Sequence, residues 1–301
     1  MEPFVTGQAH TRFAAVRDRL EAFSPRPGWR ARLYEFLLFG FKQGWACLFG
    51  GLMLALLLAT HLFYPEGAAL ARYDFLTLAA LAIQLGMLAL RLETLDEAKV
   101  ILAFHLVGTV MELFKTAVGS WEYPGDAVLR IGAVPLFSGF MYAAVGSYIA
   151  RIWRIFDFRF TAYPPRWATL VLAIAVYVNF FAHHWLPDVR IALFAALALV
   201  FARTRIWFRV WREDRWMPLL LGWFLVALFI WFAENLGTFA QAWTYPDQRA
   251  GWSMVHLGKL GAWYLLMYIS FVLVAVVHRP MPRVIQRQCD TSVSKEAVQC
   301  S

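Results

Sequence analysis

Two glutamates lie inside long apolar segments, where an ionised carboxyl group is costly. Glu112 and Glu234 each precede by nine residues the tryptophan of a Trp-x-Tyr-Pro motif. An ionisable side chain inside a bilayer costs roughly 2.5–3.5 kcal/mol on insertion scales, so it indicates a function or a partner. If Trp121 and Trp243 mark the membrane surface, each carboxyl group lies ~13 Å below it. Two buried carboxyl groups in different environments can divide into an acid and a base.

Histidines and lysines accompany the glutamates inside the apolar segments. His105 precedes Glu112 by seven residues and Lys115 follows it by three, which places all three near one helix face. His256 and Lys259 stand three residues apart in the last apolar segment. We expect the glutamates to transfer protons and the histidines to orient the reactants. The candidate catalytic residues are Glu112, Glu234, His105 and His256; the candidate substrate-binding residues are Lys115, Lys259, Trp121, Tyr123, Trp243, Tyr245, Tyr142 and Tyr264.

A structural role and a metal site are the alternatives for these groups. In the first, Lys115 and Lys259 neutralise the two glutamates and lock helices together through ion pairs. In the second, His61, His183 and His184, which end two apolar segments, bind a metal, because imidazole is a zinc ligand. No short motif of zinc-ligand spacing joins these histidines, and the three cysteines lack metal or redox spacing. We therefore predict no cofactor and keep the three histidines as a weak alternative metal site.

The composition indicates which elements must position these residues. Hydrophobic residues make up 60% of the 301 residues and charged residues 16%, and the mean hydropathy is +0.54. Soluble domains are about half apolar and about a quarter charged, and a transmembrane helix needs ~20 mostly apolar residues. The apolar segments predict an all-α integral membrane protein with eight transmembrane helices, at approximately 36–63, 73–91, 98–120, 131–150, 167–186, 189–203, 217–238 and 254–277.

The basic residues predict which side of the membrane each loop faces. With eight spans, 21 of the 28 Lys and Arg residues fall in the termini and alternate loops, against four in the other loops. Because basic residues collect on the cytoplasmic side, both termini are predicted there. The net charge of +8 thus reflects topology, and no nucleic-acid partner is expected. Residues 1–31 are predicted to form a basic amphipathic cytoplasmic segment and 278–301 a disordered polar tail.

The chain repeats itself at an offset of 122 residues. The matching positions carry Trp, His, Pro, Glu and Tyr, whereas chance matches between apolar segments would be Leu, Ala or Phe. We infer a tandem duplication of a four-helix unit, residues 32–153 and 154–277. Four spans return the chain to the same side, so the repeat is parallel and predicts a pseudo-twofold axis along the membrane normal. The clearest matches are Glu112 with Glu234, His61 with His183, Tyr142 with Tyr264, and Trp121-x-Tyr123-Pro124 with Trp243-x-Tyr245-Pro246.

Two stretches resemble a known bacterial family. They are Glu112-Leu-Phe-Lys-Thr-Ala-Val-Gly-Ser-Trp-Glu-Tyr-Pro124 and Phe36-Leu-Leu-Phe-Gly-Phe-Lys-Gln-Gly-Trp45. The likeness is to the YoaT-like integral membrane proteins, domain-of-unknown-function family 817, and it runs over most of residues 32–278. It implies a multi-pass protein of the bacterial inner membrane and no established activity.

A shorter stretch is similar to the carotenoid hydratase and small lycopene cyclase membrane proteins. It comprises Glu234-Asn-Leu-Gly237-Thr238 and the following Trp243-Thr-Tyr245. This second resemblance implies intramembrane acids that act on isoprenoid chains. The first repeat departs from the pattern, because Lys115 stands where the second repeat has Gly237.

Three kinds of function fit these observations. The leading hypothesis is an intramembrane acid/base enzyme whose paired glutamates act on an apolar lipid or isoprenoid. The alternatives are a transporter or channel that uses the same glutamates to bind a small ion or metabolite, and a structural or partner-binding membrane protein. The expected partners are the lipid bilayer and an apolar ligand, and the sequence indicates no oligomeric state.

Overall fold

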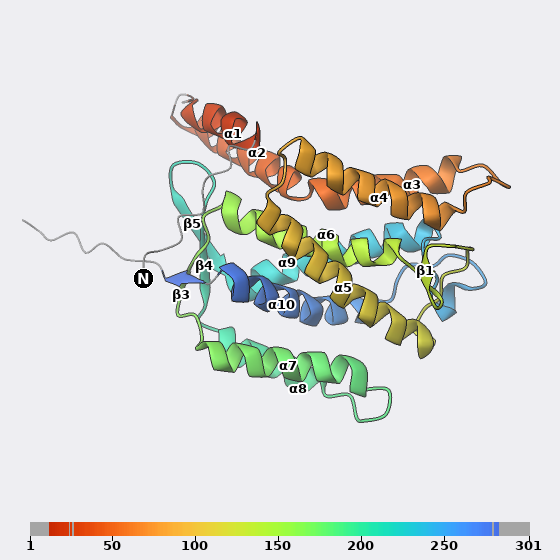
Figure 1. Ribbon diagram of the computed structural model, residues 1–301. Helices are drawn as coiled ribbons and strands as arrows, with labels where there is room; N and C mark the ends of the chain where they lie inside the picture. The colour runs from red at the N-terminus through yellow and green to blue at the C-terminus, as the bar shows by residue number, and fades with distance from the viewer. Residues whose placement is uncertain (1–11, 24, 26, 279, 283–301) are drawn as a thin grey trace, which may run out of the picture.

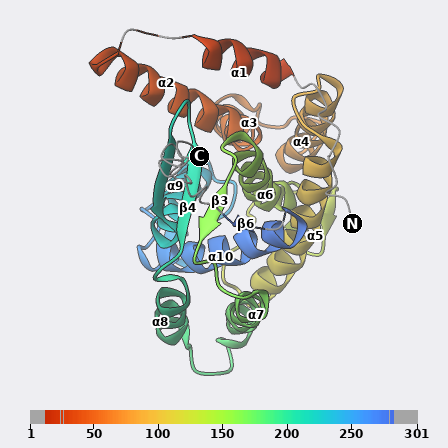
Figure 2. The same ribbon diagram turned by 90° about the vertical axis from the view of Figure 1, so that its left-hand side faces the viewer.

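The computed structural model describes residues 12–23, 25, 27–278 and 280–282 and is mostly helical (Figures 1 and 2). Residues 1–11 of the predicted amphipathic segment lie outside the described residues. So does the predicted polar tail, apart from residues 278 and 280–282. The helices are α1 (Arg12–Ala22), α2 (Trp29–Ala46), α3 (Leu48–Phe63), α4 (Arg72–Ala89), α5 (Leu95–Ala117), α6 (Phe137–Ile155), α7 (Arg166–Ala182), α8 (Arg190–Phe201), α9 (Leu219–Phe239) and α10 (Gly258–His278), with a short 3-10 helix at Pro246–Gln248.

Three helices, α5, α9 and α10, are long and apolar enough to cross a membrane within the described part of the chain. The consecutive helices α2 and α3 form a fourth such segment, but they meet at an angle of 67°. The segment predicted as a span at 36–63 is therefore two helices that meet at a bend, and not a single unbroken helix. The break falls at Cys47, between Gly44 and Gly50, and glycine pairs are a common cause of sharp kinks because they add backbone freedom.

Two small sheets qualify the expectation of an all-α chain. Strands β3 (Arg159–Thr161), β4 (Arg205–Arg209), β5 (Asp214–Pro218) and β6 (Met281–Pro282) form a sheet of order β5-β4-β3-β6. It lies at one end of the helices, and the hairpin of β1 (Arg130–Ile131) and β2 (Val134–Pro135) lies at the other (Figure 1). Strands suit these places because their edges expose backbone groups that need water or a partner.

The hairpin also corrects the start of the fourth predicted span, which begins at Phe137 rather than residue 131. The buried carboxylate of Asp74 on α4 accepts hydrogen bonds from the backbone N–H groups of Val128, at 2.9 Å, and Leu129, at 2.7 Å. These bonds satisfy two backbone N–H groups that in a helix would bond to backbone carbonyls.

Helix α6 lies at the centre of the bundle and contacts α2, α3, α4, α5 and α10. Helix α9 packs on α10, and the pair α7 and α8 lies at one side of the bundle, where α7 contacts α10 (Figure 2). The approach of α5 to α6 depends on Gly108: a Cβ there would lie 2.5 Å from the ring of Tyr142. This contact places Tyr142 close to the side chains of α5.

A buried ion pair joins α6 to the segment before α5. Arg151 Nη2 donates to Glu93 Oε1 at 2.8 Å, and both side chains are fully buried. Gln84 also donates to Glu93, and Ser147 does so at 3.3 Å. Because donors from α4 and α6 satisfy a carboxylate that lies just before α5, the cluster fixes the positions of these three helices relative to one another.

We predict that Glu93→Gln strongly destabilises the protein, because it leaves the buried guanidinium of Arg151 without its counter-charge. Removing one partner of a buried pair costs about 3–5 kcal/mol, whereas Asp96→Asn, which breaks the exposed pair with Lys99, should cost about 0–1 kcal/mol. Thermal unfolding of the detergent-purified variants measures both, and equal melting temperatures for the two variants would contradict the prediction.

Candidate functional site

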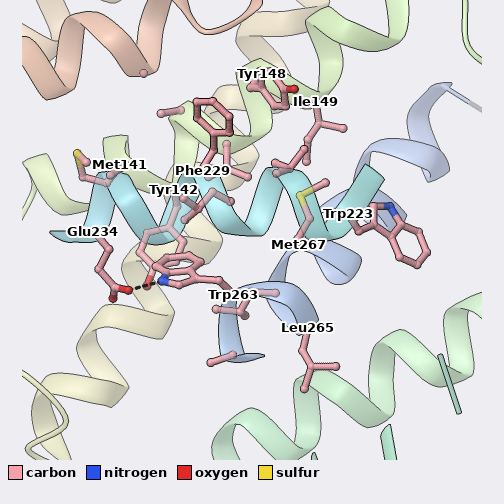
Figure 3. A pocket seen from close by; sticks show the side chains of 18 of the residues that line it. Met141, Tyr142, Tyr148, Ile149, Trp223, Phe229, Glu234, Trp263, Leu265 and Met267 are labelled. Carbon is pink, nitrogen blue, oxygen red and sulfur yellow. Dashed lines mark hydrogen bonds between the residues drawn. The ribbon is translucent and has the colours of Figure 1, made fainter. Parts of the chain in front are cut away.

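A large cavity runs along α9 and has both glutamates at one end. Its volume is about 1230 Å³, and its walls come from α2, α3, α5 to α10 and the strands β4 and β5. Figure 3 shows Glu234 near one end of α9 and Trp223 near the other. Most of the lining side chains are apolar or aromatic, so the cavity is apolar along most of its length, with its charged groups gathered at the glutamate end.

Glu112 is held by three aromatic donors and is buried. Its Oε2 accepts the indole N–H of Trp121 at 2.7 Å and the hydroxyl of Tyr123 at 2.6 Å, and its Oε1 accepts the hydroxyl of Tyr142 at 2.8 Å. Burial, and next the charge of Glu112, raise the pKa of Tyr123 well above its ordinary value, so its hydroxyl keeps its proton. Three donors to one carboxylate stabilise it in a fixed position without a cation.

Glu234 is held in a related way by two donors. Its Oε1 accepts the hydroxyl of Tyr245, and its Oε2 accepts the indole N–H of Trp263 at 2.6 Å (Figure 3). Tyr245 corresponds to Tyr123 in the repeat, but Trp263 does not correspond to Trp121. The two carboxylates therefore have different surroundings, which is the condition for dividing into an acid and a base.

The donors of the two glutamates pack against one another. The rings of Trp121 and Tyr245 lie 6.1 Å apart in an edge-on arrangement, and those of Tyr142 and Trp263 lie 6.4 Å apart. Each of these two contacts joins a donor of Glu112 to a donor of the other glutamate. Both glutamates thus belong to one aromatic cluster, and edge-on aromatic pairs add about 0.5–1.5 kcal/mol beyond their burial.

The two lysines lie beside this cluster and do not pair with the glutamates. Lys115 is buried, and its Nζ lies 2.9 Å from His184 Nε2 and 4.2 Å from the ring centre of Phe180. Lys259 Nζ lies 4.0 Å from the ring centre of Tyr245. Among the described residues, neither lysine forms an ion pair with a carboxylate. The Glu–Lys ion pairs of the alternative structural role are therefore not found in that part of the chain.

The two Trp-x-Tyr-Pro motifs pair with each other. Glu122 and Thr244 form an antiparallel bridge and exchange two backbone hydrogen bonds, of 3.0 and 2.9 Å. Across the same interface the Arg249 guanidinium donates to the Glu122 carboxylate at 2.7 Å, and this bond lowers the pKa of that carboxyl group. The donors of both glutamates are thereby set at fixed positions around the mouth of the cavity.

The structure separates the remaining predicted site residues. Trp243 and His256 line the cavity. His105 lies outside the lining and packs on Phe140, with ring centres 4.5 Å apart. Tyr264 also lies outside it, with its hydroxyl 3.4 Å from the carbonyl of Leu220.

The histidines proposed as metal ligands are only partly close together. The rings of His183 and His184 lie 4.2 Å apart, whereas His61 packs on Phe239, with ring centres 5.6 Å apart. Within the described residues no three His, Cys, Asp or Glu side chains are grouped so that they could hold a metal ion.

Sequence reasoning missed Trp263, the second donor to Glu234. The repeat pointed to its neighbour Tyr264, which matches Tyr142. Successive residues on a helix point about 100° apart, so a rotation of α10 relative to α6 exchanges one aromatic residue for the next. The sequence signal for Trp263 was its position beside Tyr264, the predicted site residue.

The helices and the cavity define a mostly helical protein with several helices suited to crossing a membrane. The profile of DUF817, described as a protein of unknown function, matches residues 35–271. The chain is 44% identical over 241 residues to the uncharacterised protein YoaT of Bacillus subtilis (strain 168). The aligned region covers 80% of this chain and 90% of YoaT. The chain therefore belongs to the DUF817 family, as the sequence resemblance predicted.

One solved structure is distantly similar. A crystal structure of a cross-linked MvINS trimer aligns with a TM-score of 0.44 at 15% identity and covers 63% of this chain and 98% of that chain. A likeness this low carries no conclusion about fold or function.

We predict that Tyr123→Phe destabilises the protein more than Tyr264→Phe. The first change removes a short hydrogen bond to a buried carboxylate, which is worth about 1.5–3 kcal/mol for a charged acceptor. The second removes a long bond to a backbone carbonyl, so it should cost about 1 kcal/mol or less. Thermal unfolding of both variants in one detergent gives the comparison, and a melting temperature for Tyr123→Phe equal to that of the unsubstituted protein would refute the assignment.

Proposed function

We propose that the protein is an eight-span inner-membrane protein built from two four-helix repeats, with both termini in the cytoplasm. The spans would be formed by α3 to α10, with α2 at the cytoplasmic surface beyond the kink at Cys47. The four-stranded sheet carries Arg159, Arg205, Arg209 and Arg215 at one end of the bundle, which suits a cytoplasmic face.

Equivalent local geometry supports the duplication. Gly119 and Gln241, which are 122 residues apart, both have positive φ, of 73° and 52°, just after α5 and α9. The next residue in each copy closes the helix with the same backbone bond: Ser120 N–H to the carbonyl of Lys115 at 2.9 Å, and Ala242 N–H to that of Gly237 at 3.0 Å. The Glu122–Thr244 bridge joins another equivalent pair, as expected where a pseudo-twofold axis passes.

Cysteine labelling tests this topology. In a background from which the three native cysteines are removed, Arg249→Cys should react with a membrane-impermeant maleimide on intact cells, because its loop lies on the outer side. Arg212→Cys, in the turn between β4 and β5, should react only after the membrane is opened. Labelling of both sites on intact cells would contradict the proposed orientation.

For the activity, we infer an acid/base enzyme that acts on an apolar lipid or isoprenoid chain held in the cavity. The observation that carries this proposal is the position of two buried, hydrogen-bonded carboxyl groups at one end of an apolar cavity. Lining residues run from Leu219 to Glu234 on α9, a rise of ~22 Å, so a long chain fits beside this helix.

The lateral wall of the cavity is consistent with a chain that enters from the bilayer. Gly44, Gly50 and Gly51 line it at the bend between α2 and α3, and Gly44 and Gly51 are exposed. A Cβ at Gly44 or Gly51 would meet no atom within 4 Å. The wall is thus thin where it faces the position of the membrane, and an apolar chain needs no aqueous path to pass there.

We predict that Gly51→Leu expels the chain. Gly51 lines the cavity and an added Cβ meets no atom within 4 Å. We therefore expect the leucine side chain to take up cavity space and to lower the amount of chain that co-purifies with the protein by at least about tenfold, equivalent to ~1.4 kcal/mol. Gly40→Leu is the matched control, because Gly40 is also an exposed helical glycine with nothing within 4 Å of its Cβ position and it does not line the cavity. Organic extraction and mass spectrometry of the purified variants measure the chain.

The catalytic step has its own test. Glu234→Gln keeps an acceptor for one donor but removes the exchangeable acidic proton, so we expect the chain to stay bound and its conversion to stop. Lipid profiles of cells producing Glu234→Gln or the unsubstituted protein show this as accumulation of one chain. Identical profiles would overturn the enzyme assignment, and glutamate-dependent ion flux in vesicles would replace it with transport.

A further inference from the structure

Five basic side chains line the glutamate end of the cavity: Lys115, His183, Arg190, His256 and Lys259. They come from α5, the end of α7, the start of α8 and the region at the start of α10. Their gathering at one end of an otherwise apolar cavity is a feature that proton transfer by the glutamates does not require.

The arginine and the histidines already have partners for part of their hydrogen-bonding capacity. Arg190 is paired with Asp188. His183 Nδ1 lies 2.9 Å from the carbonyl of Asn179, and His256 Nδ1 accepts the N–H of Gly258 at 3.0 Å. Because that bond occupies Nδ1 as an acceptor, the neutral His256 ring carries its proton on Nε2 and remains a donor there.

The lysines have unused donors at the same place. An ammonium group has three N–H donors. The Lys115 ammonium uses one of them toward His184. The Lys259 ammonium makes no hydrogen bond to the described residues and lies over the rings of Trp121 and Tyr245, 5.3 and 4.0 Å from the ring centres. Ammonium donors of the buried Lys115 and the half-buried Lys259 therefore line the cavity without an acceptor in the part of the chain that the structure describes.

The carboxylates of the site do not take up these donors. Glu112 and Glu234 together accept five hydrogen bonds from aromatic groups. The charged groups around Lys259 include Glu234, Asp247, Arg190 and Glu112, and those around Lys115 include Lys259, Arg190 and Asp188. An anion between the lysines would relieve their mutual repulsion and supply the missing acceptors.

We propose that the ligand of the cavity is an amphiphile: its apolar chain lies along α9, and its anionic oxygen head group, a phosphate or carboxylate, binds between Lys115 and Lys259. This inference rests on the proposed function, because it assigns the head group of the chain that the cavity holds. It also places the atoms nearest the head group beside Glu112 and Glu234, so proton transfer would occur at that end of the ligand.

Native mass spectrometry of the full-length protein in detergent tests the proposal with three probes: hexadecyl phosphate, hexadecanol and inorganic phosphate. We expect hexadecyl phosphate to bind at least about tenfold more tightly than hexadecanol, because only its head group offers charged acceptors. Equal binding of the two amphiphiles would overturn the head-group assignment and leave the chain-binding cavity intact. Inorganic phosphate binding as tightly as hexadecyl phosphate would overturn it as well, since the site would then recognise a free anion.

Variants separate this inference from the proposed function. Lys259→Met should remove most of the preference for hexadecyl phosphate and change hexadecanol binding by less than about twofold, while Lys259→Arg should retain the preference. Lys99→Met, at an exposed pair outside the cavity, is the control and should behave as the unsubstituted protein. If neither amphiphile binds the unsubstituted protein, the chain-binding function itself fails together with the inference.

Discussion

The structure around the site depends on the cost of placing two carboxylates among apolar helices. Each carboxylate needs donors, and this chain supplies them from tyrosine and tryptophan rather than from lysine. Aromatic donors satisfy the oxygens and at the same time present apolar ring surface to the surrounding helices. The cavity can therefore remain apolar along most of its length while it holds two acidic groups at one end.

This requirement links local structure to the overall arrangement. The donors come from α6, from α10 and from the two segments that follow α5 and α9, so every one of these elements must be fixed relative to the glutamates. The backbone bridge between Glu122 and Thr244 fixes the two segments, and the close approach at Gly108 fixes Tyr142. At the opposite end of α5, the buried Glu93–Arg151 pair holds α5 against α6. Helix α5 is thus held against its neighbours at both of its ends.

Much of this could be predicted from the sequence, because hydrophobic segments and interfacial motifs have strong signals. The predicted segments at 73–91 and 98–120 correspond to α4 and α5 within three residues, and the two glutamates and the tyrosines of the Trp-x-Tyr-Pro motifs do meet at one cavity. The kink at Cys47 and the small sheets could not be predicted, since apolar composition does not distinguish a bent helix pair from a straight one. The exchange of Tyr264 for Trp263, and the position of His105 outside the cavity, depend on helix rotation, which a single sequence does not record.

The proposed function requires that one cavity hold an apolar chain against Glu112 and Glu234. An experimental density map of the protein in lipid nanodiscs tests it most directly. We expect elongated density beside α9 that ends near the two glutamates, with both carboxylates hydrogen-bonded to their aromatic donors. A collapsed cavity, or glutamates turned away from these donors into ion pairs with Lys115 and Lys259, would contradict it.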